Sequence, residues 1–281
     1  MKNVILQCGQ RSLDLSKAQV MGILNVTPDS FSDGGRFTSL NSALRQARQM
    51  TLDGAAIIDI GGESTRPGAD PVSEQQELDR VIPVIEAIRR ELDVLISVDT
   101  STAAVIREAT LAGAHLVNDV RALQREGALQ AAADSGLPVC LMHMQGNPQT
   151  MQDNPEYRDV VQDVKQFLEQ RVEVCEKAGI IRERILLDPG FGFGKTTEHN
   201  YQLLNRMEQL HDLELPLLIG LSRKRMIGAA TGGEIAEQRV CGSVAGAVIS
   251  VMKGAKILRV HDVKETFEAL AVANATLSES V

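Results

Sequence analysis

Short apolar runs alternate with longer amphipathic segments along almost the whole chain. The runs are rich in Val, Ile and Leu and are mostly continuous, which is typical of strands buried on both faces of a parallel sheet. We expect eight such strands, at residues 20–26, 55–60, 94–98, 115–120, 138–142, 184–187, 216–221 and 256–260. The repeated alternation of strand and helix predicts an α/β fold built from βα units.

The segments between the runs have the periodicity of helices. We expect helices at residues 40–52, 72–92, 102–112, 127–133, 156–178, 199–211, 236–252 and 263–275. Ser73 and Gln76 have the spacing of a capping box at the start of the second helix. Five glycines follow helical segments, where a residue at positive φ ends a helix, and these are Gly54, Gly113, Gly136, Gly179 and Gly254.

Eight βα units are the number that a (β/α)8 TIM barrel requires, and its usual length of about 250 residues suits a chain of 281. Residues 4–15 indicate a short N-terminal hairpin, turning around residues 8–12, that would close the floor of the barrel. We expect residues 1–281 to form a single domain. A doubly wound open sheet is the main structural alternative, because alternating elements do not distinguish an open from a closed sheet.

Polar residues at the ends of the strands favour the barrel, because in a barrel every strand contributes to one mouth. Each run is followed at its C-terminal end by such residues, namely Asn25, Asp59 with Glu63, Asp99, Asn118 with Asp119, His143, Asp188, Ser222 with Lys224, and Arg259 with His261. Taken singly, an Asn or Asp caps a helix and an isolated His or Arg is most often structural. Capping does not explain the basic residues after the last two strands, so together the set predicts one shared active site.

Composition narrows the possible partners. The net charge of −8 disfavours binding to nucleic acids and to anionic membranes, and we expect neither partner. No stretch has the apolar length of a signal peptide or a membrane span, and the four cysteines are dispersed without a C-x-x-C pair. We therefore expect a cytoplasmic protein with reduced thiols.

Missing motifs narrow the chemistry. The chain has no G-x-S-x-G and no H-E-x-x-H motif, so covalent serine catalysis and a zinc hydrolase lack support. Residues 194–196 read GKT, like the end of a phosphate-binding P-loop, but the position of the first glycine is taken by Pro189. Carboxylates and amides remain on one side, and Arg66, Lys224, Arg259 and His261 on the other. This combination suits a polar heterocycle that carries a phosphorylated leaving group.

Longer motifs at these positions resemble those of the dihydropteroate synthase family over nearly the whole chain. Residues 22–34 read GILNVTPDSFSDG and residues 59–68 read DIGGESTRPG. Further matching segments are SVDT at 97–100, ND at 118–119, DPGFGFGK at 188–195, SRK at 222–224 and RVHD at 259–262. The resemblance implies a transferase of folate biosynthesis that joins a dihydropterin methyl diphosphate to 4-aminobenzoate.

The resemblance also implies roles for single residues. Asn25 would help to hold Mg2+, the expected cofactor. The pterin diphosphate would be bound by Thr65, Asp99, Asn118, Met142, Asp188, Lys224, Arg259, Val260 and His261. The 4-aminobenzoate site would be lined by Phe31, Thr65, Pro67, Phe193 and Ser222. The catalytic set would be Asp99, Arg66, Lys224, Arg259 and His261. Sulfonamides are implied as substrate analogues, and a homodimer is implied as the assembly.

The resemblance suggests a dissociative reaction in which diphosphate leaves, a pterin cation forms and the aryl amine attacks. Asp99 would then stabilise the cation. We interpret Asp59, Glu63 and His143 as structural members of the mouth. Arg225 departs from the small hydroxyl residue that is frequent in the family, which affects the local packing of its loop. A methyltetrahydrofolate-dependent methyltransferase and a non-catalytic pterin-binding module are the competing interpretations.

Overall fold

A computed structural model describes residues 5–26, 36–64, 72–146, 151 and 155–280. Its main sheet is built from β3 (Gln19–Asn25), β4 (Ile57–Gly61), β5 (Leu95–Asp99), β6 (Leu116–Asp119), β7 (Val139–Met142), β8 (Ile185–Asp188), β9 (Leu218–Ile219) and β10 (Ile257–Val260). All eight expected strands are present, and each begins and ends within a few residues of the expected position. The continuous apolar runs were therefore a sufficient signal for strands covered on both faces.

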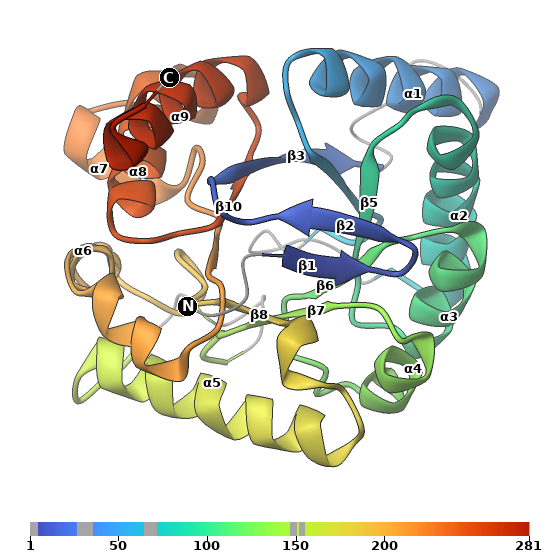
Figure 1. The fold of residues 1–281 in the computed structure, drawn as a ribbon, viewed down its shortest axis with the longest axis horizontal. Coiled ribbons are helices and arrows are strands. Elements are labelled where there is room, and N and C mark those ends of the chain that lie inside the picture. Colours follow the sequence, from blue (N-terminus) through green and yellow to red (C-terminus); the bar gives the residue numbers. More distant parts are fainter. Residues whose placement is uncertain (1–4, 27–35, 65–71, 147–150, 152–154, 281) are drawn as a thin grey trace.

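The sheet is parallel and closed. Its strand order is β8-β7-β6-β5-β4-β3-β10-β9, and a parallel bridge between Leu187 and Leu217 joins the two outer strands. This closure confirms the (β/α)8 barrel and excludes the doubly wound alternative, in which two edges would stay open. Figure 1 shows the helices as a ring around the strands.

The helices follow the strands in the order of a barrel. They are α1 (Arg36–Leu52), α2 (Glu74–Glu91), α3 (Ala103–Ala112), α4 (Ala128–Ser135), α5 (Val160–Lys177), α6 (Thr197–Asn205), α7 (Arg225–Thr231), α8 (Val240–Met252) and α9 (Val263–Ser278). Among the described residues, 3-10 helices interrupt the pattern at η2 (Arg182–Arg184), η3 (Met207–Leu213) and η4 (Ala236–Arg239). The helices expected at 199–211 and 236–252 are thus each split, because a 3-10 turn replaces one end.

Local signals for the helix ends are confirmed. The Ser73 hydroxyl accepts a hydrogen bond from the Gln76 backbone, and the Gln76 side chain accepts one from the Ser73 backbone, so α2 begins with a capping box. All five glycines expected to end helices have positive φ angles between 64° and 104°. The helix α7 was not expected, because its seven residues give too short a periodic pattern to recognise.

The N-terminal hairpin consists of β1 (Ile5–Cys8) and β2 (Arg11–Asp14) and lies across one end of the barrel (Figure 1). Its inward side chains join the first buried residues of the barrel strands in one apolar cluster. That cluster consists of Leu6, Cys8, Leu13, Leu15, Met21, Ile57, Leu95, Leu116, Cys140, Leu186, Leu218 and Ile257. Arg11 fixes the hairpin from outside, since its Nη1 donates to the Val94 carbonyl at 2.9 Å. The expected barrel floor is confirmed.

A second, larger apolar cluster fills the layer between the strands and the helices. Within the described part of the chain, no single helix has the length and apolar character to cross a membrane, although the bent pair of residues 225–231 and 236–252 passes that test together. All four cysteines are free thiols, and Cys241 alone among them is exposed.

Candidate active site

The mouth at the C-terminal ends of the strands is assembled by strand register. Asn25 pairs with Gly61 across β3 and β4, Gly61 pairs with Asp99, and Asp99 pairs with Asn118. Paired residues in parallel strands lie side by side at one level. Asn25, Asp99 and Asn118 therefore form one rim, which the fixed register of the closed barrel holds in place, whereas Asp59 pairs with Ile23 and Ser97 and lies two residues deeper.

Arg259 lies on β10, the last strand, and contacts residues of this rim. Its Nε lies 2.6 Å from Oδ2 of Asp59, and its Nη2 lies 2.7 Å from Oδ2 of Asp99. The same oxygen of Asp59 accepts a hydrogen bond from Asn118 Nδ2 at 3.1 Å. Asp59 is fully buried, and its Oδ1 has no hydrogen-bond partner among the described residues. Asp59 thus orients both Arg259 and Asn118.

Burial controls the electrostatics of this cluster. The pKa of Asp99 is raised to about 7, because desolvation outweighs the attraction of Arg259 and because Asp59 and Asp119 add like charge. Among the described residues, the hydrogen bonds of Arg259 to Asp59 and Asp99 use its Nε and Nη2 and leave Nη1 to other partners. The cluster therefore combines a carboxyl group that titrates near neutral pH with a permanent cation.

A second group lies on β8 and the loop that follows it. Asp188 Oδ1 accepts a hydrogen bond from the Gly190 backbone at 2.7 Å, and burial raises the pKa of Asp188 while Lys224 opposes that shift. Lys224 Nζ donates to the Phe191 carbonyl and lies 4.5 Å from the centre of the Phe193 ring. Burial lowers the pKa of Lys224 to about 8, although Asp188 works against the shift. This group pairs a carboxylate with an ammonium over an aromatic surface.

Gly220 lies between the two groups. A Cβ atom at this position would lie 3.9 Å from Arg259 Cδ and 4.0 Å from Asp188 Oδ2. Arg259 and Asp188 therefore approach Gly220 from its two neighbouring strands, and the glycine presents no side chain between them.

Ser222 and His261 bring the last two strands together. The Ser222 hydroxyl lies 3.1 Å from His261 Nδ1 and accepts a hydrogen bond from the His261 backbone at 3.2 Å. Arg223 is held by Asp262, with 3.0 Å between Nε and Oδ2. Arg225 is exposed at the first turn of α7, so its replacement of a small residue does not disturb the packing of this loop.

Glu63 and Asp119 belong to a supporting network beside the mouth. Both guanidinium nitrogens of Arg121 lie 3.1 Å from the carboxylate of Glu63, and Asp119 accepts from the Ser101 hydroxyl and from backbone groups. These contacts agree with the interpretation of Glu63 as structural. Arg121 was not predicted, because an arginine two residues after an Asn-Asp pair has no distinctive spacing.

His143 and Lys195 form another pair away from solvent. Lys195 Nζ lies 2.9 Å from His143 Nδ1, and both side chains are buried. The interpretation of His143 as structural is consistent with this contact. Lys195 ends both the rejected P-loop pattern and the DPGFGFGK segment, but neither predicted a role for it, and its position directly after three alternating glycines was the available signal.

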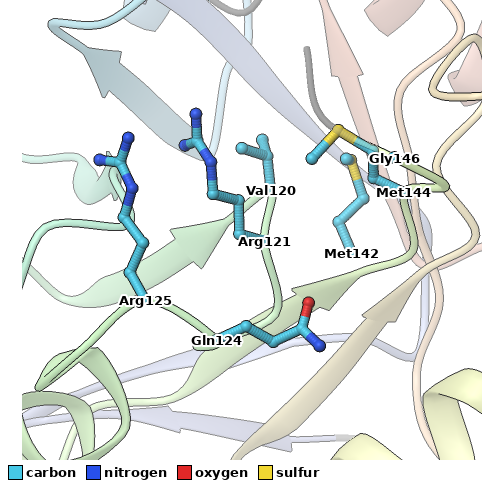
Figure 2. Close-up of a pocket in the computed structure, with 7 residues that line it drawn as sticks. All are labelled: Val120, Arg121, Gln124, Arg125, Met142, Met144 and Gly146. Carbon is cyan, nitrogen blue, oxygen red and sulfur yellow. The ribbon is translucent and has the colours of Figure 1, made fainter. Parts of the chain in front are cut away.

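A pocket opens beside the mouth between the segments that follow β6 and β7 (Figure 2). Arg121 and Arg125 extend side by side from the first segment, and Met142 and Met144 face them from the second (Figure 2). Met142, which we expected in the pterin site, lies at the end of β7 and lines this pocket.

Four of the expected site residues lie outside the described residues, namely Phe31, Thr65, Arg66 and Pro67. Val260 is buried in the apolar layer that packs against the helices, whereas its neighbour Arg259 points into the mouth, as alternation along a strand requires. Only the Val260 backbone therefore borders the mouth.

Comparisons with known proteins agree on one family. The model of the family described as pterin binding enzyme matches residues 21–261. A dihydropteroate synthase of Escherichia coli is 59% identical over 267 residues, which cover 95% of this chain and 94% of the relative.

Solved structures give the same result. A dihydropteroate synthase of Yersinia pestis in a sulfonamide drug complex superimposes with a TM-score of 0.93 at 59% identity, covering 98% of this chain and 99% of the other. A dihydropteroate synthase of Xanthomonas albilineans in complex with 7,8-dihydropteroate superimposes with a TM-score of 0.89 at 47% identity, over 98% and 99% of the two chains.

Proposed function

Because the chain belongs to the dihydropteroate synthase family, we propose that its mouth residues divide one reaction between a pterin-reading group and a diphosphate-binding group. The protein is a transferase of folate biosynthesis. It condenses (7,8-dihydropterin-6-yl)methyl diphosphate with 4-aminobenzoate to give 7,8-dihydropteroate and diphosphate. A methyltransferase and a non-catalytic pterin-binding module are thereby set aside.

The pterin-reading group is Asp188, Lys224 and Asn118. The carboxylate of Asp188 accepts two parallel N–H bonds from the amino edge of the pterin, and Lys224 donates to the oxo group. Gly220 supports this assignment, because both Asp188 and Arg259 come within 4.0 Å of the position that its Cβ would take. Met142 supplies an apolar contact, and we assign the Arg259 guanidinium to stacking on the pterin face.

The reaction breaks the bond between the methylene carbon and the diphosphate oxygen, and the electron pair leaves with the diphosphate. A pterin cation results, and the nitrogen of 4-aminobenzoate then attacks the methylene carbon and releases a proton. Asp99, in its ionised form, stabilises the cation. Arg259 and His261, with Arg66, take up the charge of the diphosphate, while Ser222 orients His261 through the contact at 3.1 Å.

Phe193 offers an aromatic face to the ring of 4-aminobenzoate, and its contact with Lys224 at 4.5 Å joins this site to the pterin-reading group. We assign Phe31, Thr65, Pro67 and Ser222 to the same site from the family motif. Sulfonamides, which bind the Yersinia pestis relative, are expected to occupy it here.

Asn25 is the residue that would hold Mg2+. Magnesium prefers oxygen ligands, keeps several waters and shares its shell with substrate phosphates, so it needs few protein ligands. Asn25 offers an amide oxygen at the rim, and the described residues contain no group of three or more His, Cys, Asp or Glu able to hold a metal alone. This donor set fits an ion brought in with the diphosphate. When bound, Mg2+ would neutralise charge on the leaving group.

The assembly and location are also proposals. We propose that α8 and α9, which lie side by side (Figure 1), form a homodimer contact. The two helices carry exposed apolar side chains, which association would cover, namely Ile249, Met252, Phe267, Val272 and Leu277. Free thiols fit a reducing compartment, so we place the protein in the cytoplasm and treat residues 1–281 as one domain.

The activity is tested by following dihydropteroate and diphosphate together. The purified protein should release one diphosphate per dihydropteroate when pterin diphosphate, 4-aminobenzoate and Mg2+ are supplied. Omission of 4-aminobenzoate is the control for simple hydrolysis. Absence of dihydropteroate would refute the assignment, and a rate unchanged by removal of Mg2+ with a chelator would refute the proposed use of the ion.

A further inference from the structure

The loop after β8, at residues 189–194, contacts two members of the pterin-reading group, Asp188 and Lys224. The backbone of Gly190 donates to Asp188, and the carbonyl of Phe191 accepts from Lys224. A Cβ atom at Gly192 would lie 3.0 Å from Lys224 Cδ, so the lysine stem packs directly on this glycine. The position of the loop therefore determines how Asp188 and Lys224 are presented.

One buried side chain, that of Lys195, holds the loop in place. Lys195 Nζ donates to the carbonyls of Gly190 at 2.8 Å and Phe193 at 3.1 Å. It also lies 2.9 Å from His143 Nδ1, on the segment after β7. Lys195 is 2% exposed and forms no ion pair with a described carboxylate, which is unusual for a lysine. Burial removes the amine of Lys195 from water, and the carbonyls of Gly190 and Phe193 replace the lost hydrogen bonds.

The two segments that Lys195 joins are in direct contact. The backbone of His143 donates to the Asp188 carbonyl at 2.9 Å, and a Cβ atom at Gly190 would lie 1.8 Å from the His143 carbonyl oxygen. The Tyr157 hydroxyl donates to the Gly194 carbonyl at 2.6 Å. His143 lies between Met142 and Met144, which line the pocket in Figure 2. The loop is thus docked against the segment that forms the apolar wall.

The arrangement holds for either charge state of Lys195. Burial lowers the pKa of His143 to about 2, so its imidazole is neutral, and burial lowers the pKa of Lys195 well below its usual range. An ammonium group donates to all three acceptors. A neutral amine keeps two N–H donors for the carbonyls and accepts a hydrogen bond from the other tautomer of His143.

We propose that Lys195 is a positioning residue for substrate binding, which acts by docking the loop at 189–194 against His143. The proposal rests on the function proposed above and assigns to Lys195 no contact with substrate. Because Asp188 and Lys224 bind the pterin before and during the reaction, a displaced loop weakens both states and raises KM more than it lowers kcat.

The test compares Lys195→Met with Lys165→Met. Lys195→Met keeps the aliphatic stem and removes the donors, whereas Lys165 forms a more peripheral salt bridge with Asp212. We expect Lys195→Met to raise KM for the pterin diphosphate by about tenfold, as loss of a hydrogen bond to a charged group does, with little change in kcat per folded protein. Lys165→Met should keep both constants at the wild-type values.

A second pair of variants, at His143, tests the positioning role of Lys195 if Lys195→Met does not fold. His143→Asn keeps an acceptor near the position of Nδ1, whereas His143→Leu removes it. We expect His143→Leu to raise KM for the pterin diphosphate and weaken its binding in calorimetry, and His143→Asn to restore both in large part. A role in folding alone would lower Tm and the folded fraction in the variants but leave KM unchanged, and that result would overturn the proposal.

The wild-type protein separates this inference from the proposed function. If it forms no dihydropteroate, the proposed function fails. If it is active and the Lys195 and His143 variants bind the pterin diphosphate as it does, the function stands and the positioning role is wrong.

Discussion

The two ends of the barrel are built from the same strands but contain opposite chemistry. At the floor, side chains from the strand starts and the hairpin form an apolar cluster that includes Leu6 and Leu13. At the mouth, the strand ends bury Asp59 and Asp188 and partly bury Asp99 around one arginine. The floor stabilises the fold, whereas the mouth keeps charges that are expensive to desolvate.

The comparison shows how a barrel separates stability from function. A buried carboxylate such as Asp59, with one oxygen unpaired within the described structure, lowers stability and is retained only where chemistry requires it. The apolar floor compensates because it seals the other end without any polar atom to satisfy. Substitutions at the two ends should therefore affect different measurements.

The largest effect is expected for Arg259→Met at the mouth. This change leaves Asp59 and Asp99 buried without their cation, so the free energy of unfolding should fall by about 3 kcal/mol. The turnover rate should fall about a thousandfold, because the positive charge that stabilises the leaving diphosphate is lost. Urea denaturation and steady-state rates measure the two effects. Adding Asp59→Asn should recover part of the stability but none of the activity, and a fully stable single variant would contradict the comparison.

A smaller effect is expected for Asp99→Asn. It should lower kcat about a hundredfold, because the cation loses its partner, while the Kd for the pterin diphosphate changes much less. Equal losses in kcat and binding would refute the catalytic role.

The same residue predicts a pH dependence. The folded-state pKa of Asp99, about 7, lies above its ordinary value of 3.8, so the folded protein binds this proton more tightly than the unfolded chain. Its contribution to stability is therefore lost as pH rises between these two values, and kcat should rise through about pH 7 as Asp99 ionises. Asp99→Asn should remove both trends.

At the floor, Leu6→Ala should affect stability alone. Leu6 is 1% exposed, and its truncation should lower the free energy of unfolding by about 3 kcal/mol with kcat and KM unchanged at temperatures where the variant is folded. The neighbouring Ile5, which is 54% exposed, is the matched control, and Ile5→Ala should cost less than about 0.5 kcal/mol. A change in KM for Leu6→Ala would show that the two ends are coupled.

The smallest effect is expected for Ser73→Ala, at the start of α2 on the mouth side of the barrel. Loss of the capping box should lower stability by about 1 kcal/mol, seen as a lower urea midpoint, without changing kcat. Ser73→Asp keeps an acceptor and should retain most of the stability. A fall in kcat for Ser73→Ala would mean that any change on the mouth side perturbs the reaction, and not only a change in the charged cluster.

Much of the fold could be predicted because its signals are local. Continuous apolar runs marked every barrel strand, and Ser73 with Gln76 marked a helix start, since each depends only on neighbours in the chain. The helix α7 escaped prediction because seven residues span barely two turns. The break between α6 and η3 at Arg206 escaped it because both segments continue one apolar pattern.

The candidate site was predicted as a set of residues but not as a set of contacts. Asp99, Asp188, Lys224 and Arg259 were identified because polar residues at strand ends are unusual in apolar runs. The supporting residue Lys195 was missed, because its role depends on His143, 52 residues earlier in the chain. Nothing in the local sequence indicates that two such residues meet.

The sequence by itself determined the elements, their order and the kinds of side chain at the strand ends, because helix and strand periodicity and residue chemistry are local properties. Only the tertiary structure decided which charges pair and which lose their water. Closure of the barrel brings Arg259 within 2.6 Å of Asp59, 200 residues away, and burial then moves the pKa of Asp99 toward neutrality. Both effects depend on distance and desolvation in three dimensions, and neither is encoded in the neighbours of these residues along the chain.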